Sequence, residues 1–312
     1  MKHTKIKILV ILLIISGIFL EYELITYSYQ KGRQDYIDDN GKIKPVLYEK
    51  SKSPKYNRIT YPLGTAKKPS GKVILMSIFT DEVSYTWKNS DDSEKDECLK
   101  KIKTAAEWIE KNALRYGNNI EFIYNWEEDD RLIKETVFNS HIDSYDACVK
   151  CGEYIDDSID VKSLLEDFNA DSIIFLFFFN SPDVYSSSNC AIAYHDGSEY
   201  PYECCLLYSN TSKRKNDATV YAHEILHTFG TIDLYRQNPS YNLIDEAYTE
   251  LKENCQDDIM DDTTHDPPRE NIVRKLSDFD AYYIGWLSDL EFVDKYNLRK
   301  SDYILKSIDI GD

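Results

Sequence analysis

A short stretch in the C-terminal half of the chain combines two histidines and a glutamate at fixed offsets: His223-Glu224-Ile225-Leu226-His227. Residues four apart lie on one face of a helix, so His223 and His227 can direct two imidazoles at a single metal ion. Glu224 stands beside them, where a carboxylate can take a proton from a water molecule that the metal holds. The pattern therefore predicts a metal site with an adjacent base.

Two residues that follow extend this motif. Gly230 permits a sharp turn after the helix, because glycine reaches backbone angles that other residues avoid. Such a turn would swing Asp233 back as a third ligand. Three protein ligands with one open position are typical of a catalytic zinc site, whereas four ligands close a structural one. We therefore expect one catalytic Zn²⁺ bound by His223, His227 and Asp233.

A glutamate on a later helix is the alternative third ligand. Glu246 and Glu250 lie at suitable distances downstream in the sequence. Gly230 favours Asp233 over both, because a turn at that position returns the chain to the histidines. Zinc occupancy in Asp233→Ala compared with Glu246→Ala separates the two ligand sets.

The run His223-Glu224-x-x-His227-x-x-Gly230-x-x-Asp233 resembles the signature of the metzincin zinc proteases. It takes the form in which aspartate replaces the third histidine, as in snapalysin-like enzymes. The resemblance covers the C-terminal third of the chain closely, and the middle only through the order of its strands and helices.

Two later segments extend the resemblance. Asp258-Ile259-Met260-Asp261-Asp262 looks like the methionine turn that metzincins carry beneath their zinc, and Leu276–Trp286 is similar to the closing helix of that family. The resemblance implies that Met260 packs under the metal and shapes the site without binding it. No tyrosine follows Met260 closely, so the extra tyrosine ligand of some members is not carried over.

The resemblance also implies a fold and an activity. The expected fold is α/β: a twisted mixed sheet packed on the active-site helix, with a smaller, mostly helical C-terminal subdomain after the methionine turn. By resemblance, Ala191–Tyr194 is an antiparallel edge strand along which an extended peptide substrate adds. The expected activity is zinc-dependent hydrolysis of peptide or protein substrates, with Glu224 as the general base.

Hydrophobic patterning supplies the elements that position these residues. Continuous or alternating apolar runs predict strands, and an acid-rich start followed by an apolar face of helical spacing predicts a helix. Strands are expected at 72–79, 119–124, 172–179, 190–194 and 203–208, and helices at 91–116, 160–168 and about 216–229. The strand at 172–179 is apolar throughout, so both of its faces should be covered. The charged stretch 127–155 gives no clear pattern.

Charge excludes one class of partner. The 312 residues include 37 basic and 55 acidic ones, a net charge of −18, which repels nucleic acid and anionic lipid surfaces. The acidic runs lack the spaced aspartates of a calcium loop, so a Ca²⁺ site among them is only a secondary expectation.

The N-terminus predicts export. Lysines at positions 2, 5 and 7 precede an uncharged apolar run from Ile8 to Leu20, as in a signal sequence. Residues 1–28 are therefore a signal peptide or a signal anchor, and residues 8–29 could hold the chain in a membrane. The polar, proline-containing stretch 29–70 reads as a stalk, linker or pro-segment. Residues 71–312 form the catalytic domain, which is expected to be secreted or membrane-anchored and extracellular.

The cysteines bear on disulfide bonding and on one of two alternatives to the zinc peptidase. Seven cysteines in an exported chain are disulfide candidates, and the odd count leaves one over. Cys148-x-x-Cys151 could be a tight bridge, a metal pair or a redox pair, and a bridge from Cys190 to Cys204 or Cys205 would tie two neighbouring strands. A thiol-disulfide protein acting through Cys148 and Cys151 lacks the expected strand-to-helix context. The remaining rival is a non-catalytic extracellular binding protein that keeps a structural zinc. An intact Glu224 argues against it, because such a protein needs no base.

Overall fold

The structure of the protein is a computed structural model. It describes residues 66, 69–83, 86–87, 92–140, 142, 147–180, 190–192, 200, 202–211, 214–234, 245–261 and 268–296. All of them belong to the compact unit Arg58–Asp312. The predicted signal or anchor at 1–28 lies outside the described residues, as does the 29–70 segment apart from Ala66, Pro69 and Ser70. Among the described residues, no helix is long and apolar enough to cross a membrane.

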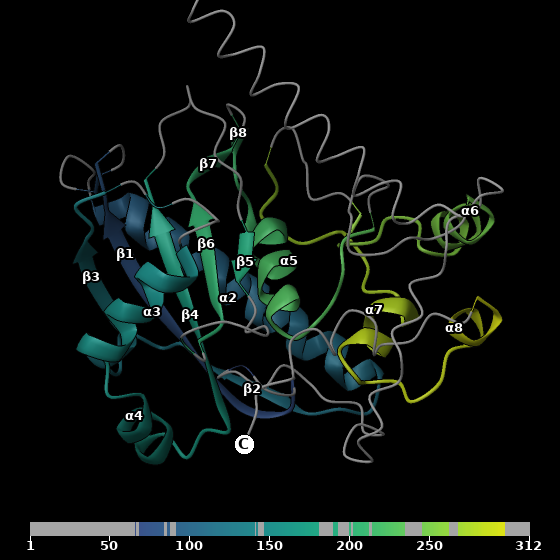
Figure 1. Ribbon diagram of the computed structural model, residues 1–312, viewed down its shortest axis with the longest axis horizontal. Helices are drawn as coiled ribbons and strands as arrows, with labels where there is room; N and C mark the ends of the chain where they lie inside the picture. The colour runs from purple at the N-terminus through teal and green to yellow at the C-terminus, as the bar shows by residue number, and fades with distance from the viewer. Residues whose placement is uncertain are drawn as a thin grey trace, which may run out of the picture. The chain divides into compact units, whose positions relative to one another are not determined.

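The centre of the fold is a six-stranded sheet in the order β2-β1-β4-β6-β5, in which β3 also pairs with β1 (Figure 1). The strands are β1 (Gly71–Asp81), β2 (Ile120–Ile123), β3 (Ile133–Val137), β4 (Ser172–Phe179), β5 (Cys190–Ile192) and β6 (Cys204–Tyr208). The long β1 serves two neighbours on one side, pairing with β2 through its first residues and with β3 through its last. All pairs are parallel except β5 with β6. The expected α/β class and the antiparallel strand at the edge of the sheet are both present.

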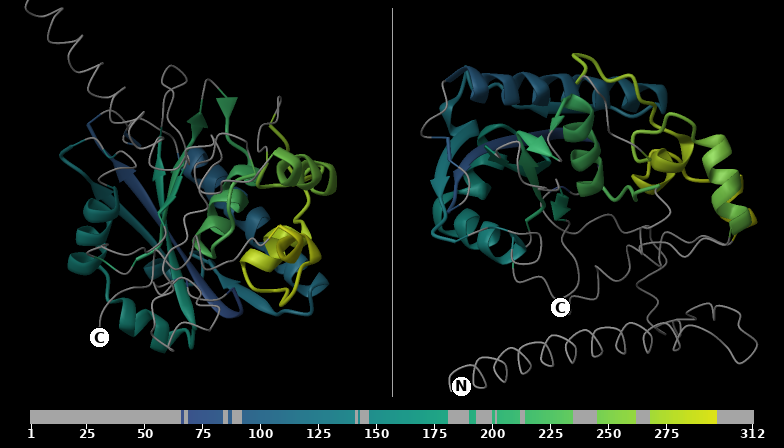
Figure 2. Two further views of the ribbon diagram at one scale, coloured as in Figure 1. Left: turned by 45° about the vertical axis from the view of Figure 1, so that its right-hand side comes forward. Right: turned by 90° about the horizontal axis from the view of Figure 1, so that it is seen from above.

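Helices cover both faces of the sheet (Figures 1 and 2). On one face, α2 (Asp92–Arg115) and α5 (Ala218–Thr228) pack on Leu75, Phe178 and their neighbours. On the other, α3 (Ala147–Ser158) and α4 (Val161–Asp167) pack on Met76, Phe177 and theirs. Every residue of β4 is buried, which is why its sequence is apolar without alternation.

The described residues of the stretch 127–155, which has no clear sequence pattern, include three elements. Asp129 begins a short 3₁₀ helix, η2 (Asp130–Leu132), by accepting a hydrogen bond from the Arg131 backbone N–H. Strand β3 follows at once; it is half exposed and rich in polar residues, so its pattern is weak. Helix α3 then carries the Cys148-x-x-Cys151 pair.

The segment that leads into α5 is a small hairpin that the sequence analysis did not identify. Its strands are β7 (Asn210–Thr211) and β8 (Arg214–Lys215). Asp217 then caps α5, because its side chain accepts a hydrogen bond from the Thr219 backbone N–H. A carboxylate at this position satisfies a backbone donor that the helix leaves open.

In the part of the chain that the structure describes, α5 is followed by α6 (Asp245–Asn254), α7 (Asp278–Tyr283) and α8 (Glu291–Lys295). They lie beyond α5, on the right of Figure 1. Ser277 and Asp280 form a capping box that begins α7. The Trp286 indole donates a hydrogen bond to the Pro69 carbonyl at 2.9 Å, which ties this part of the chain to the start of β1.

The disulfide pairings expected from the sequence are wrong for the cysteines that the structure describes. Cys151, Cys204 and Cys205 are free and buried, as are Cys98 and Cys255. The register of β5 on β6 sets Cys190 opposite Leu206 and not opposite either cysteine. Cys204 and Cys205 themselves face opposite sides of the sheet, because successive strand residues alternate.

Candidate metal centre

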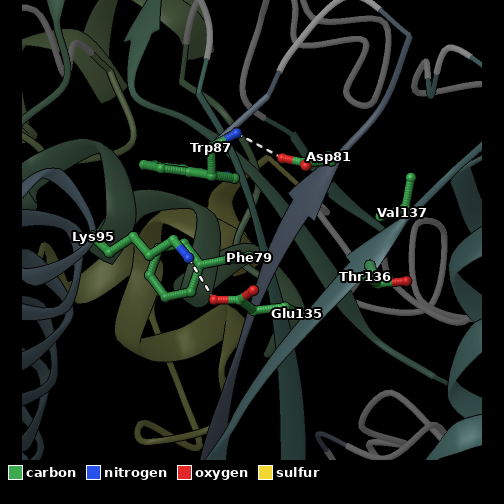
Figure 3. Close-up of a pocket in the computed structure, with 7 residues that line it drawn as sticks. All are labelled: Phe79, Asp81, Trp87, Lys95, Glu135, Thr136 and Val137. Atoms are coloured by element: carbon green, nitrogen blue, oxygen red, sulfur yellow. Dashed lines mark hydrogen bonds and ion pairs between the residues drawn. The ribbon is translucent and has the colours of Figure 1, made fainter. Parts of the chain in front are cut away.

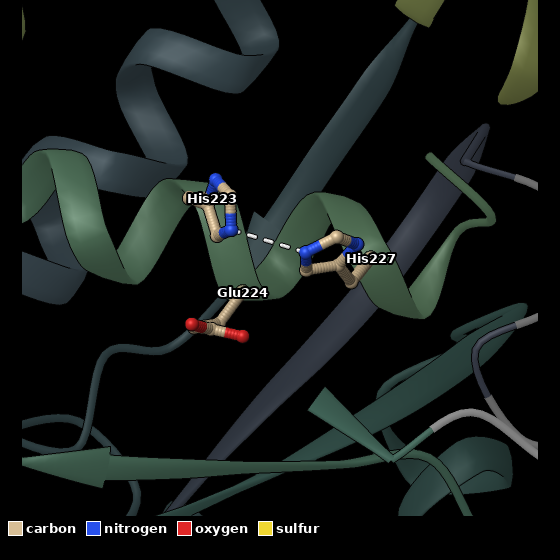
Figure 4. A group of neighbouring side chains, drawn as sticks. All are labelled: His223, Glu224 and His227. Carbon is tan, nitrogen blue, oxygen red and sulfur yellow. Dashed lines mark hydrogen bonds between the residues drawn. The ribbon is translucent and has the colours of Figure 1, made fainter. Parts of the chain in front are cut away.

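Helix α5 presents the two histidines of the motif side by side (Figure 4). Its apolar residues Ile225, Leu226 and Phe229 are fully buried against the sheet and α2, which fixes the rotation of the helix. His223 and His227, one turn apart, therefore share a face. Their ring centroids are 4.6 Å apart and their planes stand at 88°.

Backbone carbonyls fix the orientation and the tautomer of both imidazoles. His223 Nδ1 lies 2.9 Å from the Ile259 carbonyl oxygen, and His227 Nδ1 lies 2.9 Å from the Thr231 carbonyl oxygen. A carbonyl can only accept a hydrogen bond, so each Nδ1 carries the proton. In the neutral rings both Nε2 atoms are then left with a lone pair, the form in which histidine binds a metal.

The turn after α5 brings Asp233 to the same point. Gly230 has φ 102°, a backbone angle that side chains strongly disfavour, and its N–H bonds to the His227 carbonyl at 2.9 Å. Three residues later, Asp233 Oδ1 lies 3.0 Å from His227 Nε2 and 3.1 Å from His223 Nε2. The Leu234 N–H then donates to the Met260 carbonyl at 2.8 Å, which holds the turn in place.

These three atoms have the geometry of a ligand set. The two Nε2 atoms are themselves 3.0 Å apart, so with Asp233 Oδ1 they form a nearly equilateral triangle. Neighbouring ligands on a tetrahedral zinc with bonds of about 2.0–2.1 Å stand roughly 3.3 Å apart, close to the observed separations. Two lone pairs and a carboxylate that converge in a buried site require a cation or protons between them. The donor set therefore fits Zn²⁺.

The pKa shifts of Asp233 and His227 indicate the same need for positive charge between the three atoms. Burial opposes ionisation of Asp233, but hydrogen bonds from His223 and His227 outweigh it and hold the pKa of the Asp233 carboxyl well below its usual range. Burial likewise lowers the pKa of His227, yet Asp233 more than compensates, so this pKa is raised. The carboxylate thus attracts positive charge to the site.

Glu224 is the second carboxylate at the centre. It is buried, and one of its oxygens lies within 4.8 Å of a ring nitrogen of each histidine, in a group that could hold a metal ion. Asp233 Oδ1, at 3.0 and 3.1 Å from the two Nε2 atoms, is the candidate for the third ligand position. Figure 4 shows the Glu224 carboxylate beside the imidazole pair and not between the rings. That position suits a base that acts on a molecule held at the metal.

The segment Asp258–Asp261, called the Met-turn below, supports His223 from outside α5. Its Ile259 carbonyl is the acceptor for His223, and Met260 is fully buried. The Asp258 side chain accepts a hydrogen bond from the Met260 N–H at 2.7 Å, and the Ile259 N–H donates to the Lys275 carbonyl at 2.9 Å. No sequence pattern indicates these carbonyl partners, because any residue type supplies the same backbone group.

A buried acid pair anchors the Met-turn to α7. Asp258 and Asp280 are both 1% exposed, and their carboxyl groups lie near enough to each other to interact electrostatically. Burial raises the pKa of both carboxyls, and the charge of Asp258 raises that of Asp280 further. No donor among the described residues reaches Asp258 Oδ2 or Asp280 Oδ1. One proton shared between the two carboxyls satisfies both oxygens.

The alternative ligands lie elsewhere on α6. Glu246 is exposed, and Glu250 hydrogen-bonds to Lys295 and to the Tyr296 hydroxyl of α8. These bonds lower the pKa of Glu250, the Lys295 contribution being the larger. The group of metal-binding side chains found among the described residues consists of His223, Glu224 and His227, without either glutamate of α6. Asp233 is not in this group either, but its Oδ1 contacts both Nε2 atoms. The structure thus brings Asp233 to the histidines, and it does not bring Glu246 or Glu250 there.

One acidic side chain in each of the runs 127–130 and 156–157 has a protein partner. Asp129 bonds to Arg131, and Asp156 accepts a hydrogen bond from the Tyr202 hydroxyl at 2.9 Å. Helix α3 surrounds the Cys148-x-x-Cys151 motif and buries the Cys151 side chain completely. That setting does not suit a reactive dithiol, which must be accessible to its substrate.

A separate cavity of about 400 Å³ opens at the carboxyl ends of β1 and β3 (Figure 3). Phe79 and Trp87 line it, with their rings edge to face. Its charged groups have local partners: Lys95 pairs with Glu135, and Asp81 accepts a hydrogen bond from the Trp87 N–H. It contains none of the metal-site residues.

Comparisons with known proteins give a distant structural similarity. No protein-family model matches the sequence, and no curated protein matches it significantly. The structure is similar to metalloproteinase-II from Bacteroides fragilis, with 13% identity and a TM-score of 0.36 over 75% of this chain and 59% of that one. It is also similar to a chain in a chaperone-substrate complex, with 12% identity and a TM-score of 0.37 over 77% and 36%. The chain spans less than two thirds of either protein, and similarity this distant assigns no function.

Proposed function

We propose that the protein is a zinc-dependent endopeptidase of the metzincin type, with His223, His227 and Asp233 as ligands and Glu224 as the general base. One observation carries the proposal. Two imidazoles, whose tautomers are fixed by backbone carbonyls, point their Nε2 lone pairs at a partly buried carboxylate oxygen 3.0–3.1 Å away. A base stands directly beside this point.

Each side chain has a defined task in peptide hydrolysis. When bound, the zinc supplies a Lewis acid that lowers the pKa of a water molecule and polarises a peptide carbonyl. Glu224 accepts the proton of the attacking water and then delivers it to the leaving amine. Ile259 and Thr231 keep both rings in the tautomer that leaves Nε2 open. Asp233 adds a negative charge, which makes the metal a weaker Lewis acid than three neutral imidazoles would.

The proposal also covers the cellular location of the enzyme and the class of its substrate. The basic start and apolar run of residues 1–28 support export, so the proposed enzyme is secreted or membrane-anchored and acts outside the cytoplasm. Strand β5 supports a peptide substrate, because an antiparallel edge strand has free backbone groups along which an extended chain can pair.

The test compares the full-length wild type with Glu224→Gln, and uses Glu246→Gln as a matched control. Glu246 is exposed on α6, so its amide substitution removes the same charge outside the site. We expect one zinc per chain in all three proteins, measured by elemental analysis. Cleavage of a quenched peptide library is expected only in the wild type and Glu246→Gln.

Other outcomes would identify a different function. Zinc in every protein without cleavage in any of them would favour the non-catalytic binding protein that keeps a structural zinc. Loss of zinc in Glu246→Gln, but not in Asp233→Ala, would show that the third ligand lies on α6. A wild type that binds no zinc would refute the proposal.

A further inference from the structure

The cavity at the carboxyl ends of β1 and β3 has the size and the position of a second binding site (Figure 3). Its volume of about 400 Å³ is within the range of small-molecule sites in proteins. In open α/β sheets, ligands bind in the crevice outside the carboxyl ends of the strands. The residues that line the cavity include no residue of the metal centre, so a ligand here would occupy a separate site.

The cavity forms where β1 and β3 extend beyond the part of the sheet that α2 covers. Phe79 pairs in register with Glu135, and two residues further along Asp81 pairs with Val137. Residues two apart on a strand share a face, so these four side chains are on the face that carries α2. Lys95, in the first turn of α2, reaches Glu135, whereas Val137 is 60% exposed. The end of the two strands is therefore an open floor beside the helix.

Trp87 supplies a fixed wall of this cavity. Its backbone N–H donates to Asp81 Oδ1 at 2.6 Å, and its indole N–H donates to the Phe178 carbonyl at 3.0 Å. The ring stands edge-on to Phe79, with the centroids 5.1 Å apart and the planes at 88°. A wall that is already held by two hydrogen bonds and a ring contact needs no ordering when a ligand binds, which favours affinity.

The charges that line the cavity leave one carboxylate uncompensated. Lys95 and Glu135 form an ion pair, so their charges cancel. Asp81 accepts a hydrogen bond from a backbone N–H, which is neutral and does not cancel the charge of the carboxylate. Among the described residues, no cationic side chain pairs with Asp81. Two carboxylates and one ammonium group thus give the lining a net charge of −1, whose complement is a cation.

Lys95 shows that the cavity accommodates a cation. Its Nζ lies 5.4 Å from the centroid of the Phe79 ring while it pairs with Glu135. The face of an aromatic ring attracts a positive charge at this distance. The cavity thus combines aromatic rings with carboxylates, the two kinds of group that bind organic cations, and only one of its two carboxylates already has a cation of the chain.

We infer that the cavity binds an alkylguanidinium group, with Asp81 as its anionic partner. A guanidinium is planar and always charged, donates two parallel hydrogen bonds to one carboxylate and packs well against aromatic rings. The exposed Val137 offers an apolar surface for the alkyl stem. Free arginine and an arginine side chain of a peptide both supply this group. The inference does not depend on the proposed peptidase activity, because no metal-site residue takes part.

The test is a ligand-observed NMR titration of the full-length protein at low ionic strength with N-acetylarginine amide. N-acetylcitrulline amide has nearly the same shape without the charge and is the matched ligand control. We expect a Kd on the order of 1 mM for the arginine probe. The citrulline probe should bind at least ~10-fold more weakly, because it cannot make a charge-assisted hydrogen bond. Free arginine, titrated in parallel, shows whether the site also accepts the group outside a peptide.

Variants of the lining assign the binding to Asp81. Asp81→Asn should weaken binding of the arginine probe ~10-fold, and its amide oxygen can still accept the Trp87 N–H. Asp96→Asn removes the same charge at an exposed position of α2 outside the cavity, and it should leave the affinity unchanged. Lys95→Met should tighten binding, because Glu135 then becomes a second anionic partner for the ligand. A purely structural role of Lys95 would not produce this gain.

Several results would overturn the inference. Wild type that does not bind the arginine probe, or that binds the citrulline probe equally well, has no guanidinium site. Equal weakening by Asp81→Asn and Asp96→Asn would show a general effect of charge. Preferential binding of N-acetylglutamate amide would make Lys95 the recognition group of an anion site. If Asp81→Asn fails to fold, Lys95→Met and the ligand comparison in the wild type still decide. Zinc content and peptide cleavage, measured separately, decide the proposed function.

Discussion

Replacing Asp280 by asparagine tests whether the acid pair Asp258–Asp280 shares one proton. Asp280 Oδ2 accepts hydrogen bonds from the Ser277 N–H and hydroxyl, both at 3.1 Å. An asparagine at 280 can keep its oxygen in that position and turn its amide N–H toward Asp258. The amide then supplies permanently the hydrogen bond that the wild type makes only while the pair holds its proton. We therefore expect Asp280→Asn to fold and to hold the Met-turn.

The two proteins should differ in the pH dependence of their stability. Burial raises the pKa of Asp280 in the folded state above the value of about 3.9 that an aspartate has in the unfolded chain. Between these two pKa values the folded wild type binds one proton more than the unfolded chain, so its stability falls as pH rises. For one proton, the free energy of unfolding changes by at most about 1.4 kcal/mol per pH unit. Asp280→Asn lacks this proton and should lack this contribution to the slope.

The measurement is urea unfolding of both proteins at pH 4, 5, 6 and 7 in the presence of zinc. Other titrating groups, including Asp261 beside Asp258, affect both proteins, so the difference between the two unfolding free energies isolates Asp280. The unfolding free energy of Asp280→Asn minus that of the wild type should rise with pH by up to about 1.4 kcal/mol per pH unit. It should become constant above the folded-state pKa of the pair. Asp278→Asn, an exposed change on the same helix, is the control for charge. A difference that does not change with pH would refute the shared proton.

Two further predictions concern the metal site. Asp233→Ala should weaken zinc binding, measured by competition with a chelator, by more than the ~10–100-fold typical for loss of a group that only orients a ligand; unchanged affinity would exclude Asp233 as a ligand. Gly230→Ala should lower the free energy of unfolding by ~1–3 kcal/mol in a denaturant titration, because alanine strongly disfavours a φ of 102°; a neutral effect would show that the turn relaxes.

The sequence predicted the strands and helices whose residue pattern lies within the element itself. β4 begins and ends at the expected residues, because a strand buried on both faces is apolar from end to end. Helix α2 matches its prediction within one residue at each end, since its apolar face and acidic start are both visible in the sequence. Strand β3 escaped prediction: it is short and half exposed, and its position depends on pairing with the distant end of β1.

The metal site also combines features that a local sequence pattern predicts with features that depend on tertiary contacts. The spacing of His223 and His227 on a helix follows from the sequence, and so does the turn that Gly230 permits. The carbonyls of Thr231 and Ile259 could not be predicted as partners, because a backbone carbonyl leaves no signal in residue type. Sequence thus identified the candidate side chains, and only the tertiary structure showed what orients them.

Three separate segments build the centre, and this has a physical consequence. The histidines come from α5, Asp233 comes from the turn after it, and the carbonyl that orients His223 comes from the Met-turn. The Met-turn is held in turn by Lys275 and by the acid pair with Asp280. These segments converge only in the folded chain, so the free energy of metal binding is also folding free energy for the Met-turn and α7. The acid pair therefore influences the metal site through Ile259 without touching it, since a shift of that carbonyl releases the His223 ring from its orientation.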